Sequence, residues 1–225
     1  MDIKRKLYWL MQAGVSCFCS ESPQKSVSSE RPTEVSACAQ ATLTASKAKD
    51  LPALNSDKES FGLSSLKKTA AHTIFGQGLA KPTLMCIMET PDTDSDRSGQ
   101  TLAGPLGEQF GKMMTAIHLD TSKDVYVTYL SPWRTPGNRT LTEAERALFL
   151  PFLVREIQLV RPQKILLFGA GVAQALLNID SLAKARGKWH KWENIPVRTT
   201  LAISSLKATP QRRQAWEDLQ AVEKE

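Results

Sequence analysis

Carboxyl side chains follow a short apolar run near the middle of the chain, and they are the first candidates for chemistry. Four of them fall within eight positions, at Glu89, Asp92, Asp94 and Asp96. Carboxylate oxygens bind hard cations, but the glycine and the distal glutamate of a calcium loop are missing. The stretch therefore predicts a solvated acidic loop, or one positioned carboxylate, Glu89, rather than a metal site.

Two glycines, Gly169 and Gly171, half-match the fingerprint of a dinucleotide-binding turn. The third glycine of that fingerprint is missing, and the pair follows the third predicted strand instead of the first. A tight turn from a strand into a helix is the favoured interpretation.

Two segments could contact the phosphates and bases of a nucleic acid. One joins Trp133 to a proline-glycine turn with an arginine on each side, and the other lies near the C-terminus. The candidate contacts are Arg134, Asn138, Arg139, Ser204, Ser205, Leu206, Lys207, Arg212 and Arg213. The alternative is that Asn138 caps a loop whose arginines are solvated.

The remaining candidates do not support nucleophilic catalysis. His118 and His190 have no carboxylate or nucleophile at a sequence spacing that would indicate a catalytic pair. Ser204 and Ser205 lack the glycines of a nucleophile elbow. A hydrolase with a serine triad is therefore not expected.

The overall charge favours a polyanionic partner without requiring one. The 225 residues carry 29 Lys and Arg against 23 Asp and Glu, which gives a net charge of +6. Such an excess is typical of proteins that bind DNA, RNA or an anionic membrane face, and also of many that do not. No apolar run approaches the roughly 20 residues of a transmembrane helix, so no membrane partner is expected.

The cysteines indicate a reducing compartment. Cys17, Cys19, Cys38 and Cys86 are too few for the disulfide framework of a secreted protein. The spacing of Cys17 and Cys19 does not fit the usual zinc pair, and Cys86 sits in an apolar run like a small buried hydrophobe. We therefore expect a cytoplasmic protein.

The composition divides the chain near residue 70. Residues 7–11 predict a short amphipathic helix rather than a signal peptide. Segments 18–35 and 44–70 are rich in Ser, Lys, Ala, Glu and Pro, which predicts that residues 1–70 are largely flexible apart from that helix. Residues 71–225 are expected to form the folded domain.

Along residues 71–225, apolar runs typical of strands alternate with segments of helical periodicity. These predicted strands and helices must position the candidate residues. Strands are expected at 83–88, 124–130, 164–168 and 197–203. Helices are expected at 104–117, 142–160 and 210–222, with a short one from the Gly171 turn to 177. This order predicts an α/β three-layer sandwich around a four-stranded parallel sheet, with ligands bound beyond the carboxyl ends of the strands.

Five blocks between residues 71 and 222 resemble the uracil-DNA glycosylase superfamily, most closely family 4 of the bacterial type. They lie in the family's order at 89–107, 125–143, 151–162, 186–189 and 209–219. The first contains Glu89-Thr-Pro91, and the second contains Trp133-Arg134-Thr-Pro136-Gly-Asn-Arg-Thr140. The resemblance implies the uracil-DNA glycosylase fold and an enzyme that flips a uracil out of DNA and hydrolyses its glycosidic bond.

The resemblance also assigns roles to single positions. Glu89 matches the glutamate at the uracil pocket that is associated with the water. Leu102 replaces the phenylalanine that stacks on uracil, Tyr129 replaces the asparagine that reads its edge, and Ala202 replaces the histidine that donates to its O2 atom. Leu206 matches the leucine that wedges the DNA. The resemblance therefore implies that base reading and anion stabilisation are lost.

The iron–sulfur cluster of the family is expected to be absent. Cys38 matches its first cysteine ligand, but Ala41, Trp133 and Phe149 fall at or near the other three positions. One cysteine cannot hold a cluster, so no cofactor and no metal are expected.

Three hypotheses for function follow. In the first, a monomeric glycosylase-like domain binds DNA with little or no uracil excision. In the second, an active glycosylase uses Glu89 to position water, and Tyr129 or Ser204 replaces the missing donors for another base. In the third, residues 1–70 recruit a protein partner and the domain is a scaffold.

Overall fold

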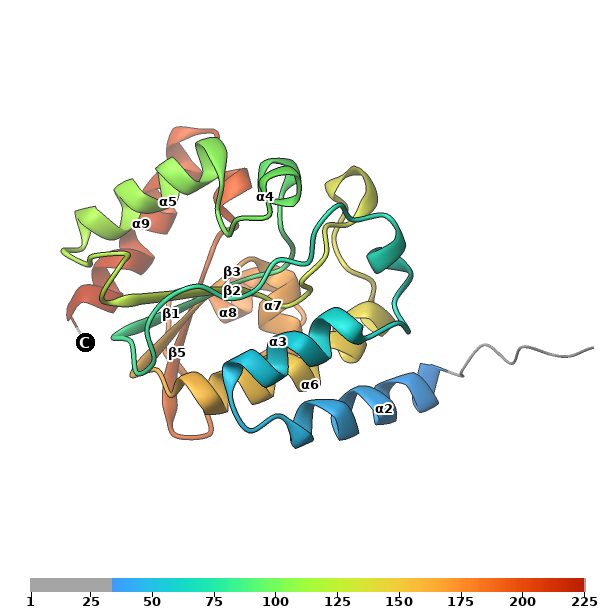
Figure 1. Cartoon of the computed structure of the whole chain (residues 1–225). Helices are drawn as coiled ribbons and strands as arrows, with labels where there is room; N and C mark the ends of the chain where they lie inside the picture. Colours follow the sequence, from blue (N-terminus) through green and yellow to red (C-terminus); the bar gives the residue numbers. More distant parts are fainter. Residues whose placement is uncertain (1–33, 225) are drawn as a thin grey trace, which may run out of the picture. The chain divides into compact units, whose positions relative to one another are not determined.

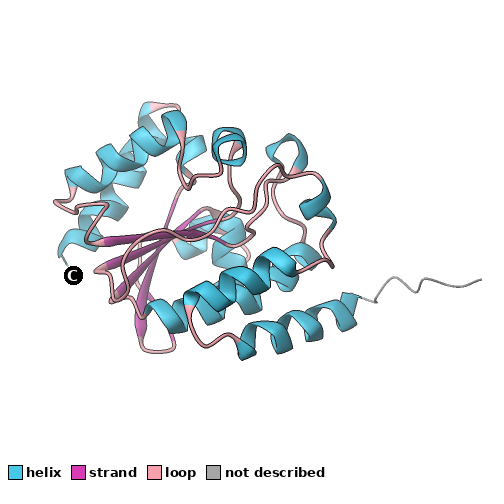
Figure 2. Cartoon of the chain, in the orientation of Figure 1, coloured by secondary structure: helices cyan, strands magenta, loops and turns pink. Residues whose placement is uncertain are grey.

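The computed structural model describes residues 34–224, which form one sheet with helices on both sides (Figures 1 and 2). The strands are β1 (Leu84–Met88), β2 (Val125–Tyr129), β3 (Lys164–Phe168), β4 (His190–Trp192) and β5 (Ile195–Thr200). The helices are α2 (Glu34–Lys47), α3 (Leu51–Ser60), α4 (Thr93–Ser98), α5 (Gly104–Ala116), α6 (Glu143–Val160), α7 (Ala170–Leu177), α8 (Leu182–Ala185) and α9 (Thr209–Lys224). Three short 3-10 turns are η1 (Ser65–Lys68), η2 (Pro136–Asn138) and η3 (Ile203–Ser205). No helix in the described range is long and apolar enough to cross a membrane.

The sheet confirms the expected α/β architecture and corrects its strand count. The strand order is β2-β1-β3-β5-β4, and the first four strands run parallel. The fifth, β4, pairs antiparallel with β5 across a two-residue connection, with Trp192 opposite Ile195. The expected strand at 197–203 begins earlier and ends at Thr200, because the chain turns into η3 after Ala202.

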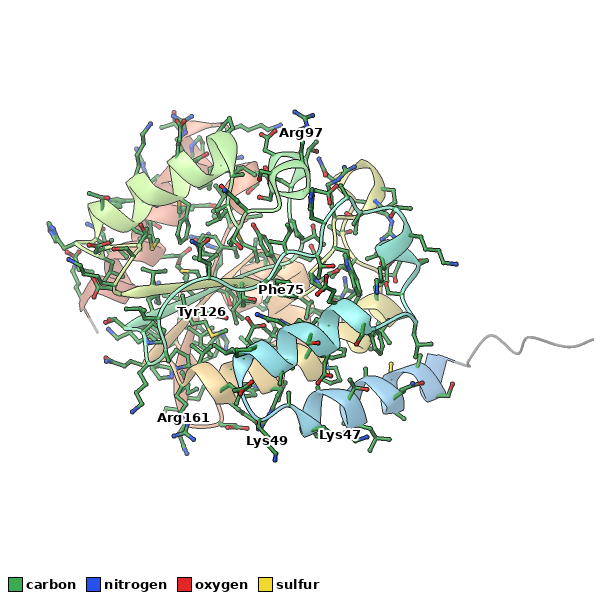
Figure 3. All side chains as sticks on the ribbon, viewed as in Figure 1. Lys47, Lys49, Phe75, Arg97, Tyr126 and Arg161 are labelled. Carbon is green, nitrogen blue, oxygen red and sulfur yellow. The ribbon has the colours of Figure 1, made fainter. Side chains whose placement is uncertain are left out.

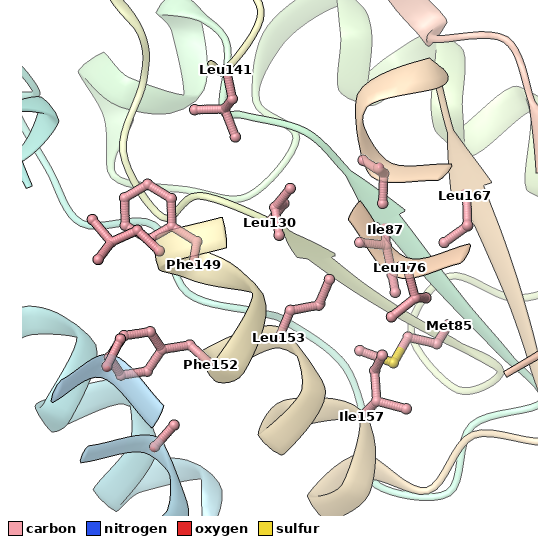
Figure 4. Packing of buried hydrophobic residues seen from close by; sticks show 14 of the residues in the cluster. Met85, Ile87, Leu130, Leu141, Phe149, Phe152, Leu153, Ile157, Leu167 and Leu176 are labelled. Carbon is pink, nitrogen blue, oxygen red and sulfur yellow. The ribbon is translucent and has the colours of Figure 1, made fainter. Parts of the chain in front are cut away.

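One side of the sheet, here called the closed face, is covered by α6, α7 and α8, with α2 and α3 packed against α6 (Figure 1). Figure 4 shows α6 in this layer, with Leu153 and Ile157 on the side of the helix that faces the strands. Phe149, at the other end of the view, packs against Trp133. All these side chains are buried. This layer is the larger of the two hydrophobic cores.

Residues 34–70 correct the expected flexible segment. Ala37, Ala41 and Ala45 recur every four residues, so they lie on one side of α2 and are buried, as is Leu54 of α3. Polar residues of α2 such as Gln40, Ser46 and Lys47 are exposed, as Lys47 is in Figure 3. The folded part therefore begins well before residue 71. The amphipathic helix expected at 7–11 lies outside the described residues.

A buried polar network fixes α3 and α6 to the sheet on the closed face. Glu156 is fully buried and forms an ion pair with Lys58 of α3. Tyr126 and Thr128 of β2 each donate a hydroxyl hydrogen bond to Glu156 Oε1, at 2.9 Å. Burial and the neighbouring carboxylate raise the pKa of Tyr126, so its hydroxyl stays protonated and can donate.

The other side of the sheet, here called the open face, is covered by α5 and α9. Phe110 and Met114 of α5 and Leu219 of α9 pack against strand residues such as Cys86. These two helices leave a groove between their outer parts, which is described below.

Candidate functional site at the strand ends

A cavity of about 480 Å³ lies beyond the carboxyl ends of β1, β3 and β5. This is the position at which parallel α/β sheets bind ligands. It brings together residues from the loops that follow all four parallel strands, namely Glu89, Asp92, Asp94, Leu102, Asn138, Arg139, Gly169, Gly171, Ala202 and Ser204.

Glu89, directly after β1, is a half-buried carboxylate of this cavity. Its side chain is 18% exposed, and its Oε1 atom accepts a hydrogen bond from the Leu141 N–H at 3.1 Å. Arg146 Nη1 lies 3.8 Å from the same oxygen. Burial raises the pKa of Glu89, and the Leu141 N–H and Arg146 oppose that effect. Both contacts use Oε1, so Oε2 is the oxygen left for a ligand or water.

Gly171 is required because the Glu89 carboxylate occupies the space where its side chain would be. A β-carbon at this position would overlap both carboxylate oxygens. The carboxylate therefore lies against the first turn of α7, where the helix dipole favours negative charge. Gly169, with φ of 98°, makes the sharp turn before α7. The glycine pair thus serves a tight turn, as expected, and in addition makes room for Glu89.

Tyr129, at the end of β2, is not part of the cavity wall. It is buried, and its hydroxyl oxygen accepts a hydrogen bond from the Leu102 N–H at 3.1 Å. Leu102 itself lines the cavity and has the left-handed φ of 54°. Burial raises the pKa of Tyr129. The hydroxyl therefore positions the Leu102 loop, and it does not face a ligand as a replacement donor.

Ala202 and Ser204 form the side of the cavity that follows β5. Ala202 offers only a methyl group, and its carbonyl accepts a hydrogen bond from the Ser205 hydroxyl at 2.6 Å. Ser204 is exposed at the rim. Of the two replacement donors considered from the sequence, only Ser204 lies where it could meet a ligand.

Carboxylates dominate the charge of the cavity. Glu89, Asp92 and Asp94 all line it. Arg139 also lines it, but both of its terminal nitrogens bind Glu145, at 2.7 and 2.8 Å. The cavity therefore favours ligand groups that donate hydrogen bonds over groups that carry negative charge.

The expected nucleic-acid contacts separate into paired and unpaired side chains. Arg134 Nε lies 3.3 Å from Asp96 Oδ2, and its Nη1 atom donates to Asn138 Oδ1 at 3.1 Å. Arg134 and Arg139 therefore stabilise the loop before α6. Lys207 and Arg213, by contrast, are exposed and form no ion pair within the described part of the chain.

Leu206 does not project as the expected wedge. Its side chain is only 5% exposed and lies on the floor of the groove between α5 and α9. Its carbonyl accepts a hydrogen bond from Arg212 Nε at 3.1 Å. Both residues therefore belong to the open face, beside the cavity.

The residues that match cluster-ligand positions do not fit an iron–sulfur cluster. Trp133 and Phe149 are buried edge to face, with ring centroids 5.7 Å apart. Ala41 is buried in the same hydrophobic core, and Cys38 packs against it. Three of these four side chains have no atom that could bind iron.

Sequence analysis missed Arg146 and the role of Gly171. Arg146 binds the Leu141 carbonyl at 2.6 Å and Gln174 Oε1 at 3.0 Å, which holds it beside Glu89. Its position in the first turns of α6, after the capping box of Thr142 and Glu145, was the only sequence signal. That signal identifies the helix start but not the neighbouring carboxylate.

Comparisons with known proteins agree with this geometry. The sequence model of the uracil DNA glycosylase superfamily matches residues 75–220. A type-4 uracil-DNA glycosylase of Saccharolobus solfataricus is 30% identical over 132 residues, which cover 56% of this chain and 61% of that protein. The type-4 enzymes of Archaeoglobus fulgidus and Pyrobaculum aerophilum are 27% and 26% identical, and the matches cover 80% and 79% of those proteins and 68% and 67% of this chain.

The family match covers the whole sheet and every residue of the cavity lining. The strand order, the cavity at the strand ends and the enclosed glutamate after β1 therefore all lie within the matched region. The chain belongs to the uracil-DNA glycosylase superfamily.

Proposed function

We propose that this protein binds DNA and has little or no uracil excision. The observation that carries the proposal is the charge of the cavity beyond Glu89. Asp92 and Asp94 line it and form no ion pair within the described residues, whereas Arg139, the arginine of the lining, is held by Glu145. Cleaving the bond between uracil and its sugar leaves negative charge on the base, which needs donors where the charge develops. Carboxylates beside the base would raise the energy of that charge.

The residues at the aligned positions support the same conclusion. Ala202 has no donor, and the Tyr129 hydroxyl is engaged by the Leu102 backbone. Loss of one donor to a developing anion typically lowers a rate by about 100- to 1000-fold. If the two losses multiply, excision should be slower by about 10⁴- to 10⁶-fold.

DNA binding is supported by cations next to the cavity. Lys207 is exposed on the segment that joins η3 to α9, and Arg213 is exposed near the start of α9. Ser204 and Ser205 precede both. Phosphate contacts of this kind supply affinity that falls as salt rises. The net charge of +6 acts in the same direction.

One assay tests binding and excision together. The full chain is incubated with a uracil-containing duplex and with a cytosine-paired control, and both mobility shift and strand cleavage at abasic sites are scored. We expect a salt-sensitive shift on both duplexes without cleavage. Cleavage of the uracil strand at rates typical of glycosylases would contradict the proposed loss of excision.

An active glycosylase with a different base preference is the second candidate. It is favoured by Glu89, which lines the cavity and whose Oε2 atom, unlike Oε1, is not engaged by Leu141 or Arg146 and could position water. Glu89→Gln retains the shape of the side chain but removes the charge. Excision that this variant abolishes would establish the second candidate, and excision that it leaves unchanged would exclude a role for Glu89.

Matched charge variants test the phosphate contacts. We expect Lys207→Ala/Arg213→Ala to reduce the slope of log affinity against log salt by about 1 to 2. The control, Lys47→Ala/Lys49→Ala, removes the same charge from the end of α2 and from the connection to α3, on the closed face (Figure 3). Equal slopes in the two double variants would show that binding depends on net charge alone.

The proposal also includes a domain without an iron–sulfur cluster, because buried apolar side chains fill three of the four matching positions. Iron analysis and visible absorbance of protein purified without oxygen should both be negative. Stoichiometric iron would contradict it.

A further inference from the structure

The groove on the open face has a volume of about 510 Å³. The function proposed above gives this groove no role. Its floor is apolar and is formed by Met113 of α5, by Leu206, and by Ala215 and Leu219 of α9. Trp216 lies on its wall with 39% of the residue exposed. Among the described residues it is the only large aromatic residue that is this exposed, so its ring is available to a ligand.

Cations surround this aromatic ring. Lys112 of α5 and Arg212 of α9 line the groove, and Lys207 and Arg213 lie at the adjoining start of α9. None of the four forms an ion pair within residues 34–224. The Nε atom of Arg212 is held by the Leu206 carbonyl, which fixes the guanidinium at the groove.

The opposing negative charge is smaller. Glu108 lines the groove, and Glu217 is exposed on α9. Four cations against two carboxylates give a positive surface around an apolar floor. An aromatic side chain among unpaired cations is the arrangement with which proteins bind single-stranded nucleic acid, since bases stack on the ring and phosphates meet the cations.

The groove and the cavity share a wall. Ile203 and Ser204 line the cavity, whereas Leu206, which follows them, lines the groove. On α5, Leu106 lines the cavity and Pro105 lines the groove. A nucleic-acid strand bound at one site would therefore reach the other by crossing η3 and the first turn of α5.

We propose that the groove is a stacking site for a base of single-stranded DNA, next to the cavity, with Trp216 as the platform. Lys112, Lys207 and Arg213 hold the flanking phosphates. This inference rests on the proposed DNA binding. It adds that the groove takes a single-stranded segment and that Trp216 is the residue on which a base stacks.

Fluorescence anisotropy with a short labelled oligothymidylate tests the proposal on the full chain. Trp216→Ala is expected to weaken binding about 5- to 150-fold, the range for loss of one stacked base, whereas Trp216→Phe should stay close to the wild type. An abasic oligomer of equal length keeps the phosphates but has no bases. Its affinity should be the same for the wild type and for Trp216→Ala.

The outcomes separate this inference from the function on which it rests. Unchanged affinity of Trp216→Ala for oligothymidylate, with binding still present in the wild type, would overturn the stacking site but leave DNA binding intact. No binding of oligothymidylate by the wild type would also overturn the stacking site. The proposed DNA binding would fall with it only if the duplexes of the assay above gave no mobility shift either. Lys112→Ala gives a second measurement that leaves the ring intact, and it should lower the salt slope by about 0.7. Lys47→Ala is the matched control, and an equal slope in both variants would count against the groove.

Discussion

The two faces of the sheet are covered in different ways. On the closed face, α6 lies between the strands and the outer helices α2 and α3, and a buried ion pair joins α3 to α6. On the open face, α5 and α9 form a smaller core and leave an apolar groove with an exposed tryptophan. The difference indicates that stability is concentrated on the closed face, while surface for ligands is kept on the open face and at the strand ends.

Removing the buried Glu156 carboxylate should give the largest loss of stability, and it tests whether stability is concentrated on the closed face. Glu156→Ala leaves Lys58 buried without its partner, and loss of one member of a buried pair typically costs about 3–5 kcal/mol. The matched control is Glu223→Ala on α9, whose ion pair with His118 is largely exposed and should be worth less than about 1 kcal/mol. Urea unfolding measures both, and similar losses would contradict the division.

A pair of glycine substitutions gives an intermediate effect. Gly171→Ala places a β-carbon on the Glu89 carboxylate, and we expect it to lower the free energy of unfolding by about 1–3 kcal/mol. Gly111→Ala, in α5 on the open face, has no neighbouring atom within 4 Å and should raise stability by up to about 1 kcal/mol. Equal effects in thermal and urea unfolding would show that the strand-end site is not tightly packed.

The smallest effect on the free energy of unfolding is expected for the Arg139–Glu145 ion pair beside the cavity, and this effect depends on pH. The Arg139 guanidinium, with help from Thr142, lowers the pKa of Glu145 to about 2. Because this folded-state pKa is below the ordinary value of 4.5, the pair stabilises the fold above about pH 4.5, and its contribution is lost as the pH falls towards 2. Since the pair is partly exposed, Glu145→Gln should cost less than about 1 kcal/mol at pH 7.

Unfolding of the wild type and of Glu145→Gln at several pH values provides the measurement. The difference between them should shrink between pH 4.5 and pH 2. A difference that is the same at all pH values would mean that the hydrogen bonds of Glu145, rather than its charge, matter for stability.

Much of the sheet could be predicted because its strands are continuous apolar runs. The runs at 84–88, 125–129 and 165–168 are buried at every position, which is typical of parallel strands. The helices at 34–60 were missed because their buried stripe consists mainly of alanines, whose small side chains do not raise the hydrophobicity of a Ser- and Lys-rich segment. Their four-residue spacing was the available signal. The three-residue strand β4 was too short to show a pattern.

The candidate site was predictable in its location and less so in its contacts. Glu89 could be placed at a strand end because the preceding run is a strand. The partners of Arg134 and Arg139 could not be predicted, because Asp96 lies 38 positions away and Glu145 competes with phosphate for Arg139. Tyr129 showed the same difficulty, since nothing in the sequence indicates that its hydroxyl meets the Leu102 backbone.

The shared space of Glu89 and Gly171 has an evolutionary consequence. One residue follows β1 and the other follows β3, yet a single volume must accommodate both side chains. A larger residue at position 171 is therefore compatible only with a shorter one at position 89. In natural relatives of this chain, substitutions at positions 89 and 171 should therefore be correlated. Where the glutamate is replaced by a shorter residue, a residue larger than glycine can be accepted at position 171.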